Sequence, residues 1–219
     1  IRSTVGRVLL LAVLFTGAAG RLDALVAGWS LPPYLHGLIF LTLASAVLSL
    51  LEFPLSLYSR FVIEEEFGFN SLTMKTLLAD SAKQTLLGAV LLAVLLGGLY
   101  GALAWIGRWW WLASWGFWAV FQLLMVVLYP LVIAPLFNKF ESLPEGSLRS
   151  RLEALADRNS FANSGIYVMD GSRRSRHSNA YFTGIGKARR IVIFDTLIDA
   201  LEEDELEAVL AHEIGHWKY

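Results

Sequence analysis

The sequence predicts a mainly α-helical membrane protein with about four transmembrane helices, followed by a small α+β domain. Apolar side chains make up 56% of the 219 residues, and the mean hydropathy is +0.55. The composition changes after residue 137, because most of the charged residues lie in the last part of the chain. We therefore expect a transmembrane region over residues 1–137 and a polar domain over residues 138–219.

Long apolar stretches account for the expected membrane helices. Between residues 86 and 136 the only charged residue is Arg108, which divides two apolar stretches that are each long enough to cross a bilayer. Tryptophans surround this arginine, as is typical of side chains at the level of the lipid headgroups. The four expected spans cover residues 5–28, 34–58, 85–106 and 110–134.

The first span has an alternative interpretation. Its apolar part, residues 8–19, follows two arginines and has the length of the apolar core of a signal peptide. A membrane helix is favoured, because the apolar pattern resumes at residues 22–29 and the chain does not begin with Met.

The basic residues predict the orientation of the spans. Those before the first span and between the second and third are Arg2, Arg7, Arg60, Lys75 and Lys83. The segments on the opposite side of the bilayer contain only Arg21 and Arg108. Since basic loops stay in the cytoplasm, the polar domain is expected to face the cytoplasm.

The polar domain is expected to combine helices with strands. Pro130 and Pro135 mark the expected exit from the fourth span. Residues 147–158 have the apolar spacing of an amphipathic helix, and short apolar runs at residues 165–170 and 190–195 predict two strands. The second strand leads into a long acidic helix that ends the chain.

That last helix contains the motif HExxH at residues 212–216. Residues four apart lie on the same face of a helix, so the imidazoles of His212 and His216 can bind one Zn²⁺ ion. Glu213 is placed to act as the general base toward a water at that ion. The alternative is a chance match with two ordinary surface histidines.

The motif lacks a third zinc ligand. Catalytic zinc takes three protein ligands and a water, but only three residues follow His216. Asp170 or Asp195 could replace the missing ligand, although their spacing does not single them out. Because Ile1 is not an initiator residue either, the chain is expected to be truncated at both ends.

Four separate stretches resemble a known family. They cover residues 57–70 with EEEFGFN, 133–140, 169–184 with SRHSNAYF, and 190–197 together with the HExxH region at 211–217. The family is that of the type I CAAX prenyl proteases, which are membrane zinc endopeptidases of seven helices. The chain resembles a bacterial relative in this family, and the resemblance extends from about residue 55 to the end.

The resemblance implies a ring of membrane helices around a cavity, with a zincin-like catalytic domain that breaks off after the HExxH helix. His212 and His216 would be the zinc ligands and Glu213 the base. Asn179 and Ala180 fall in the family segment that looks like an edge strand pairing with an extended substrate. The family's third ligand, a glutamate on a later helix, has no counterpart here, and neither do its first and last membrane helices.

The implied activity is cleavage of peptide bonds near the C-terminus of prenylated CAAX-type peptides or other membrane-associated peptides. The expected partners are such a peptide, the lipid bilayer and the missing carboxyl-terminal part of the same enzyme. The expected location is a bacterial inner membrane, or the endoplasmic reticulum in a eukaryote. Nucleic acid is not expected as a partner, and the absence of cysteine excludes a cysteine nucleophile.

Two other functions remain open. One is an intramembrane protease of the site-2 type, but the acidic residues 202–205 argue against a lipid-spanning HExxH helix. The other is a catalytically incompetent fragment or scaffold with a vestigial or structural zinc motif. Glu213 argues for catalysis, since a structural site has no use for a base, whereas the missing ligand argues for the scaffold.

Overall fold

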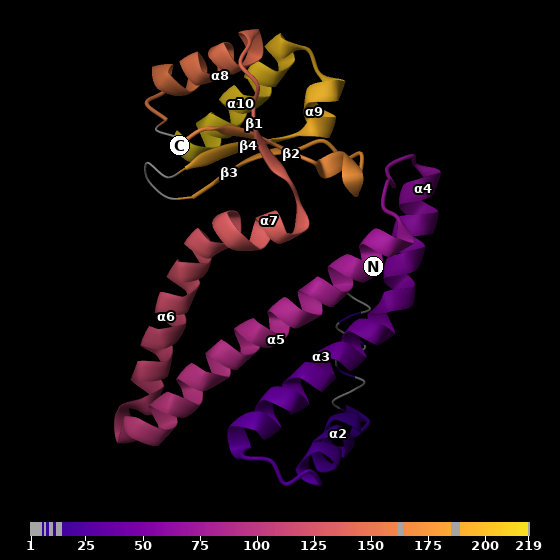
Figure 1. Cartoon of the computed structure of the whole chain (residues 1–219), viewed down its shortest axis with the longest axis vertical. Coiled ribbons are helices and arrows are strands. Elements are labelled where there is room, and N and C mark those ends of the chain that lie inside the picture. Colours follow the sequence, from indigo (N-terminus) through magenta and orange to yellow (C-terminus); the bar gives the residue numbers. More distant parts are fainter. Residues whose placement is uncertain are drawn as a thin grey trace. The chain divides into compact units, whose positions relative to one another are not determined.

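The computed structural model describes residues 6, 8, 11, 15–161, 164–184 and 189–218. The chain divides into two compact units (Figure 1). The first unit contains residues 1–66 and 74–121, and the second contains residues 67–73 and 122–219. The short segment 67–73 thus belongs with the carboxyl-terminal part of the chain, although it lies between two helices of the first unit in sequence.

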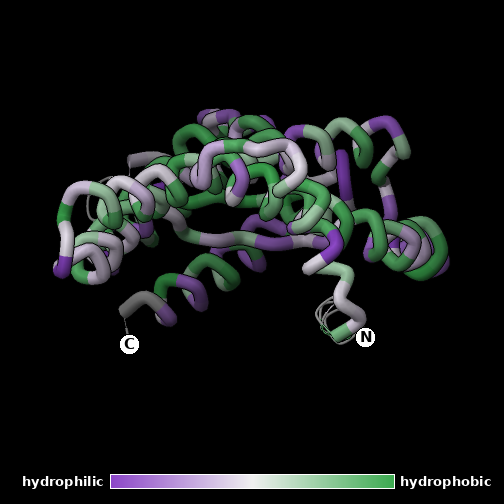
Figure 2. The backbone as a smooth tube through the Cα atoms, turned by 90° about the horizontal axis from the view of Figure 1, so that it is seen from below, coloured by the Kyte–Doolittle hydropathy of each residue, from purple (hydrophilic) through white to green (hydrophobic). Residues whose placement is uncertain are grey.

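Helices make up the described part of the first unit. They are α2 (Ala18–Ala27), α3 (Pro33–Tyr58), the π-helical η1 (Ser59–Ile63), α4 (Glu64–Glu66), α5 (Met74–Trp105), the 3-10 turn η2 (Gly107–Trp109) and α6 (Trp110–Leu128), which continues into the second unit. Apolar residues recur along the long helices (Figure 2). Three stretches among the described residues are long and apolar enough to cross a membrane: Pro33–Glu66, Met74–Trp105 and Gly107–Phe137.

The helices extend beyond the expected apolar spans. Helix α5 begins at Met74 rather than near residue 85, because its polar first turns are good helix formers that lie outside the apolar stretch. Within them Asp80 is buried, with 8% of its surface exposed. The first half of the first expected span, residues 5–28, is described only in part, and its second half contains α2.

Neither Pro130 nor Pro135 ends the helix of the fourth expected span. The helix continues through the π-helical η3 (Tyr129–Ile133) and then α7 (Ala134–Phe137), and ends at Phe137. A proline removes one backbone donor and crowds the preceding turn, and a wider π-helical turn is one way to accommodate it within a helix. Pro54 lies inside α3, which likewise continues into a π-helical segment.

Helices α3 and α5 pack against each other through tyrosines. The hydroxyl of Tyr34 donates to the carbonyl of Ala93 at 2.9 Å, and that of Tyr100 donates to the carbonyl of Pro33 at 3.1 Å. The two rings meet edge to face with their centroids 5.9 Å apart. These polar contacts, one partly buried and one exposed, fix the helices in register where apolar packing alone is not specific.

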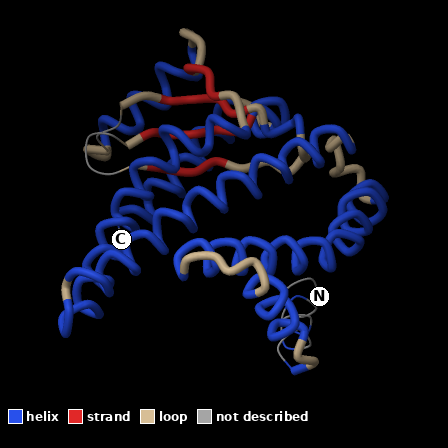
Figure 3. The backbone as a smooth tube through the Cα atoms, turned by 60° about the horizontal axis from the view of Figure 1, so that its bottom comes forward, coloured by secondary structure: helices blue, strands red, loops and turns tan. Residues whose placement is uncertain are grey.

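The second unit is built on a four-stranded sheet. Its strands are β1 (Phe140–Ser142), β2 (Ile166–Met169), β3 (Ala180–Thr183) and β4 (Arg190–Phe194). Their order is β1-β2-β4-β3, with β2 and β4 parallel and the outer pairs antiparallel (Figure 3). The two strands expected from apolar runs are the central pair, and β3 lies at an edge of the sheet.

Helices cover one face of this sheet. They are α8 (Ser147–Arg158) and α10 (Glu203–Lys218), while the 3-10 turn η4 (Gly171–Arg173) follows β2 and the short α9 (Asp195–Ala200) follows β4 (Figure 1). Helix α8 has the range that the apolar spacing predicts. The core of the unit is formed by Leu143, Leu152, Leu155, Ala156, Phe161, Ile166, Ala180, Ile191, Ile193, Leu197, Leu206, Leu210 and Ile214. The predicted mainly α-helical membrane fold with a small α+β domain is confirmed.

Gly98 provides a test of the packing between α5 and α6. A Cβ atom at this position would lie 2.3 Å from the ring of Phe117, whereas a Cβ at the neighbouring Gly97 would meet nothing within 4 Å. We expect Gly98→Ala to lower the free energy of unfolding by about 1–3 kcal/mol, because the Phe117 ring must move. The measurement is thermal unfolding of the purified chain in detergent.

Gly97→Ala is the matched control for this prediction. It adds the same methyl group one residue away and should leave the melting temperature unchanged or slightly raised, since Ala favours the helix. Equal melting temperatures for the two variants would contradict the packing described here.

Candidate metal centre

Helix α10 is oriented by an apolar face. Leu206, Leu210 and Ile214 follow one another at helical spacing, and each exposes 3% or less of its surface. This face packs into the core of the unit, together with residues of the sheet and of α8. Because the three residues fix the rotation of the helix, His212 and His216 lie on its exposed side.

The two histidines of the motif converge. Their Nε2 atoms are 2.9 Å apart, and the rings are nearly perpendicular with centroids separated by 4.5 Å. Two nitrogens bound to one tetrahedral zinc ion at the usual bond length are about 3.3 Å apart, so a small rotation of either ring would open the space for the metal. Glu213 lies between the exposed and buried faces of the helix and is half-buried.

No third ligand joins the histidines within the described ranges. There, no group of three or more His, Cys, Asp or Glu side chains could hold a metal ion. Asp170 accepts a hydrogen bond from the backbone of Lys139 at 2.7 Å, and Asp195 accepts from Ser172 and Thr196. The two aspartates that the sequence left open as ligands therefore serve to fix loops instead.

Arginines of α8 hold the first half of α10. Arg151 Nη2 lies 2.8 Å from Glu207 Oε2, and the same guanidinium pairs with Asp204 at 2.5 Å. Arg158 contacts the other oxygen of Glu207 at 3.0 Å. The hydrogen bonds to Glu207 and then Asp204 raise the pKa of Arg151 above its ordinary value. These exposed pairs add modest stability and keep the metal-binding helix against α8.

The residues expected to bind substrate lie at the start of the edge strand. Asn179 is exposed and its carbonyl accepts from the backbone of Phe194 at 3.0 Å, while its side-chain oxygen accepts from the backbone of Ala180 at 2.9 Å. In an antiparallel pair, alternate residues turn their backbone groups toward the partner strand. Asn179 and Tyr181 therefore face β4, and the backbones of Ala180 and Phe182 face the open edge. The sequence gave no indication that Phe182 lies at this open edge.

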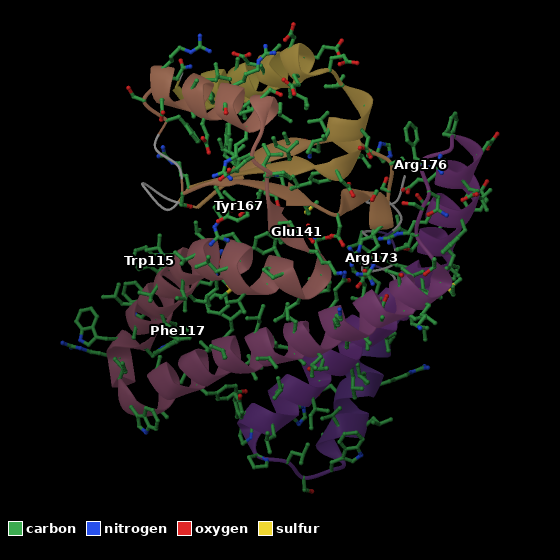
Figure 4. The ribbon with its side chains drawn as sticks, turned by 45° about the horizontal axis from the view of Figure 1, so that its top comes forward. Trp115, Phe117, Glu141, Tyr167, Arg173 and Arg176 are labelled. Atoms are coloured by element: carbon green, nitrogen blue, oxygen red, sulfur yellow. The ribbon has the colours of Figure 1, made fainter. Side chains whose placement is uncertain are left out.

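An aromatic cleft lies on the sheet face opposite α8 and α10, where Tyr167 projects from β2 (Figure 4). The lining residues are Tyr129, Pro130, Ala134, Phe140, Tyr167, Tyr181, Thr183, Arg190 and Val192. The guanidinium carbon of Arg190 lies 5.0 Å from the centroid of the Tyr167 ring. Burial, and secondarily the nearby Tyr129, raises the pKa of Tyr181 above its ordinary value.

A helical membrane part joined to an α+β domain with paired histidines on one helix is the arrangement of a membrane metallopeptidase. The sequence profile described as the CAAX prenyl protease N-terminal region, with five membrane helices, matches residues 1–139. The profile of peptidase family M48 matches residues 142–219. The chain therefore belongs to peptidase family M48, on the branch of the CAAX prenyl proteases, and the expected family is confirmed. Membership in a metallopeptidase family implies a metal cofactor.

Curated relatives agree with this assignment. CAAX prenyl protease 1 of Saccharomyces cerevisiae is 45% identical over 191 residues, which cover 84% of this chain and 41% of that protein. The CAAX prenyl protease 1 homolog of Oryza sativa subsp. japonica is 44% identical over 194 residues, with coverages of 84% and 44%.

The fold also matches a solved structure. The crystal structure of S. mikatae Ste24p superimposes with a TM-score of 0.88 at 39% sequence identity, over 96% of this chain and 51% of that chain. The chain thus spans about half the length of this relative and somewhat less than half of the two curated proteins.

The raised pKa of Tyr181 predicts a pH dependence. Burial favours the neutral phenol, so its contribution to stability is fully present below the ordinary tyrosine pKa of about 10 and is lost as the pH rises through the higher folded value. In an ultraviolet absorbance titration, Tyr181→Phe should remove a transition on the alkaline side of the ordinary tyrosines. If Tyr181→Phe instead removed a transition at the ordinary tyrosine pKa of about 10, the burial of Tyr181 would be contradicted.

Proposed function

We propose that this chain carries the N-terminal membrane helices and two zinc ligands of an integral-membrane zinc endopeptidase. The convergence of the His212 and His216 Nε2 atoms to 2.9 Å carries the proposal. Membership in peptidase family M48 and the similarity to CAAX prenyl proteases support it. The proposed substrates are prenylated CAAX-type peptides, or other membrane-associated peptides, cut near their C-terminus.

The donor atoms fit zinc. Two neutral imidazole nitrogens aimed at one point are ordinary zinc ligands, and a helix fixes their spacing. When bound, zinc supplies Lewis acidity toward a water molecule and a peptide carbonyl. We assign the third ligand to the part of the relatives that this chain does not cover, because the described residues lack one. That part is the proposed partner of the chain within the complete enzyme.

Glu213 is the proposed general base. It is the next residue after the first ligand and is half-buried, so its carboxylate can reach the attacking water without leaving the helix. The carboxylate takes the proton of this water as the oxygen attacks the peptide carbonyl, and then gives the proton to the leaving amine. His212 and His216 keep their positions throughout, since the buried face of α10 holds them.

The open edge of β3 is the proposed substrate site. An extended peptide would add to the sheet beside Ala180 through backbone hydrogen bonds, a way of binding that tolerates varied side chains. The N–H of Ala180 is already bonded to the Asn179 side chain, which leaves its carbonyl and the backbone of Phe182 to pair with the peptide. Asn179 fixes the start of the strand and borders the peptide.

The proposed setting is a membrane whose cytoplasmic side holds residues 138–219. The apolar stretches within residues 1–137 would lie in the lipid bilayer. Basic residues on the segments flanking the spans support this orientation. In a eukaryote the membrane would be that of the endoplasmic reticulum, and in a bacterium the inner membrane.

A second candidate function is a scaffold with a vestigial or structural zinc motif. The lack of a third ligand within the described ranges favours it. Metal content and activity separate the two functions, because a scaffold needs neither an exchangeable metal nor a base at position 213.

Metal content is the first prediction from the proposed site. A chimaera that joins this chain to the downstream part of the Saccharomyces cerevisiae relative, which would supply the third ligand, should contain near-stoichiometric zinc when purified in detergent. In that chimaera His216→Ala should lower the zinc affinity by about a hundredfold or more, since loss of an outer partner alone typically costs 10–100-fold. Elemental analysis after dialysis measures this. His36→Ala is the control, because His36 is not part of the motif. Its Nε2 atom lies 2.8 Å from a carboxylate oxygen of Asp23. Equal metal loss in both variants would contradict the assignment.

Activity is the second prediction. The same chimaera, which contains the part of the enzyme that this chain does not cover, is used to measure cleavage. Glu213→Gln should reduce cleavage of a prenylated peptide by about 10²- to 10⁴-fold while zinc content stays unchanged. Glu207→Gln on the same helix is the control, since Glu207 only pairs with α8. Cleavage that survives Glu213→Gln would exclude the proposed base.

A further inference from the structure

Residues 67–73, here called the docking loop, contact the connection between β2 and β3. The ring of Phe69 stacks on His177 with the centroids 4.2 Å apart and the planes at 19°. The carbonyl of Phe69 accepts from the backbone of Arg176 at 2.9 Å, and Asn70 forms an isolated antiparallel bridge with Ser175. Arg173 and Arg176, which belong to this connection, are labelled in Figure 4.

The docking loop is ordered by its own side chains as well. The side-chain oxygen of Asn70 accepts from the backbone of Leu72 at 2.9 Å, which closes a local turn. Leu72 is buried, with 5% of its surface exposed, and anchors the loop. The hydroxyl of Ser71 donates to the carbonyl of Ser172 at 2.5 Å, so the loop reaches both ends of the same short connection.

The opposite side of the connection is held by β4 and α9. Asp195 accepts from the backbone of Ser172 at 2.9 Å and also from its hydroxyl. Thr196 donates through its hydroxyl to the carbonyl of His177 at 3.1 Å, and its own carbonyl accepts from the Ser178 hydroxyl at 3.1 Å. The connection therefore lies between the docking loop and the N-terminus of α9.

The held segment leads directly into the edge strand. His177, which stacks on Phe69, is two residues before Asn179 and three before Ala180. Beyond Ser178, the hydrogen bonds given above for Asn179 and Ala180 are with β4 and with each other, and Ala180 also packs in the core of the unit. The start of β3 is thus held by β4 and the core, and also by the fixed positions of His177 and Ser178 directly before it.

We infer that the docking loop positions the substrate-binding edge of β3, with Phe69 as the principal positioning residue. The inference rests on the proposed function, because it assigns the edge of β3 to substrate. Phe69 acts through His177 and does not touch the peptide. The loop has no part in the core of the α+β unit, whose members all come from residue 143 onward. Removing the Phe69 side chain should therefore displace the open edge of β3 without unfolding the sheet.

The docking loop contains its own matched control. Phe67 is the same residue type two positions earlier and exposes 68% of its surface, whereas Phe69 exposes 39% and stacks on His177. Phe67→Ala removes the same number of atoms from the same loop. Phe69→Tyr keeps the flat ring and should preserve the stack.

Hydrogen exchange of the 219-residue chain tests the placement without any activity. In Phe69→Ala, backbone amides of residues 177–183 should exchange about two- to tenfold faster, in line with the loss of one aromatic pair, while those of β2 and α8 keep their wild-type rates. Phe67→Ala and Phe69→Tyr should match the wild type. Unchanged exchange at residues 177–183, or equally faster exchange throughout the domain, would overturn the inference.

Kinetics of the chimaera test the consequence for substrate. Phe69→Ala should raise KM for the peptide by about two- to tenfold with zinc content unchanged and kcat changed less than KM, and Phe69→Tyr should restore it. A KM equal to that of Phe67→Ala would overturn the positioning role. If instead the wild-type chimaera binds zinc but cleaves no peptide, or if Glu213→Gln keeps full activity, the proposed function fails, and the exchange experiment still decides whether the loop holds the edge strand.

Discussion

The rotation of α10 about its axis is set by Leu206, Leu210 and Ile214, and the geometry of the site depends on it. Because each of these side chains is buried in the core, the helix cannot turn by one residue without exposing them and burying polar groups. This constraint directs His212 and His216 to the exposed side and leaves Glu213 at its border. The α8 arginines strengthen the same arrangement from outside the core.

Much of the fold could be predicted from the sequence because its main elements have strong local patterns. Continuous apolar stretches indicated the long helices, and the apolar spacing of α8 gave its full range. Local rules treat proline as a helix end, whereas here the helix continues through a π-helical segment that contains Pro130 and then through α7, which contains Pro135. Strand β1 was missed because its three residues are mostly exposed and have no apolar periodicity.

The candidate site divides in the same way. The paired histidines could be predicted because a four-residue spacing on a helix brings two side chains together without help from the rest of the chain. The contacts of Asp170 and Asp195 with distant backbone groups could not, and both aspartates remained open as ligands until those contacts were known. The stack of Phe69 on His177 joins residues far apart in sequence, and no local pattern signals such a contact.

The long sequence separation between these contacting residues also limits when the contacts can form during synthesis. Ser71 bonds to Ser172 and Ser175 bonds to Phe69 across sequence separations of 101 and 106 residues, and these intervals contain two of the long apolar helices. During synthesis the docking loop leaves the ribosome well before its partner exists, so it must wait while both helices enter the bilayer. The docking contact can therefore form only after residues 74–137 have been made, and the metal-binding helix α10, which follows later in the chain, is added after the residues that hold the edge strand.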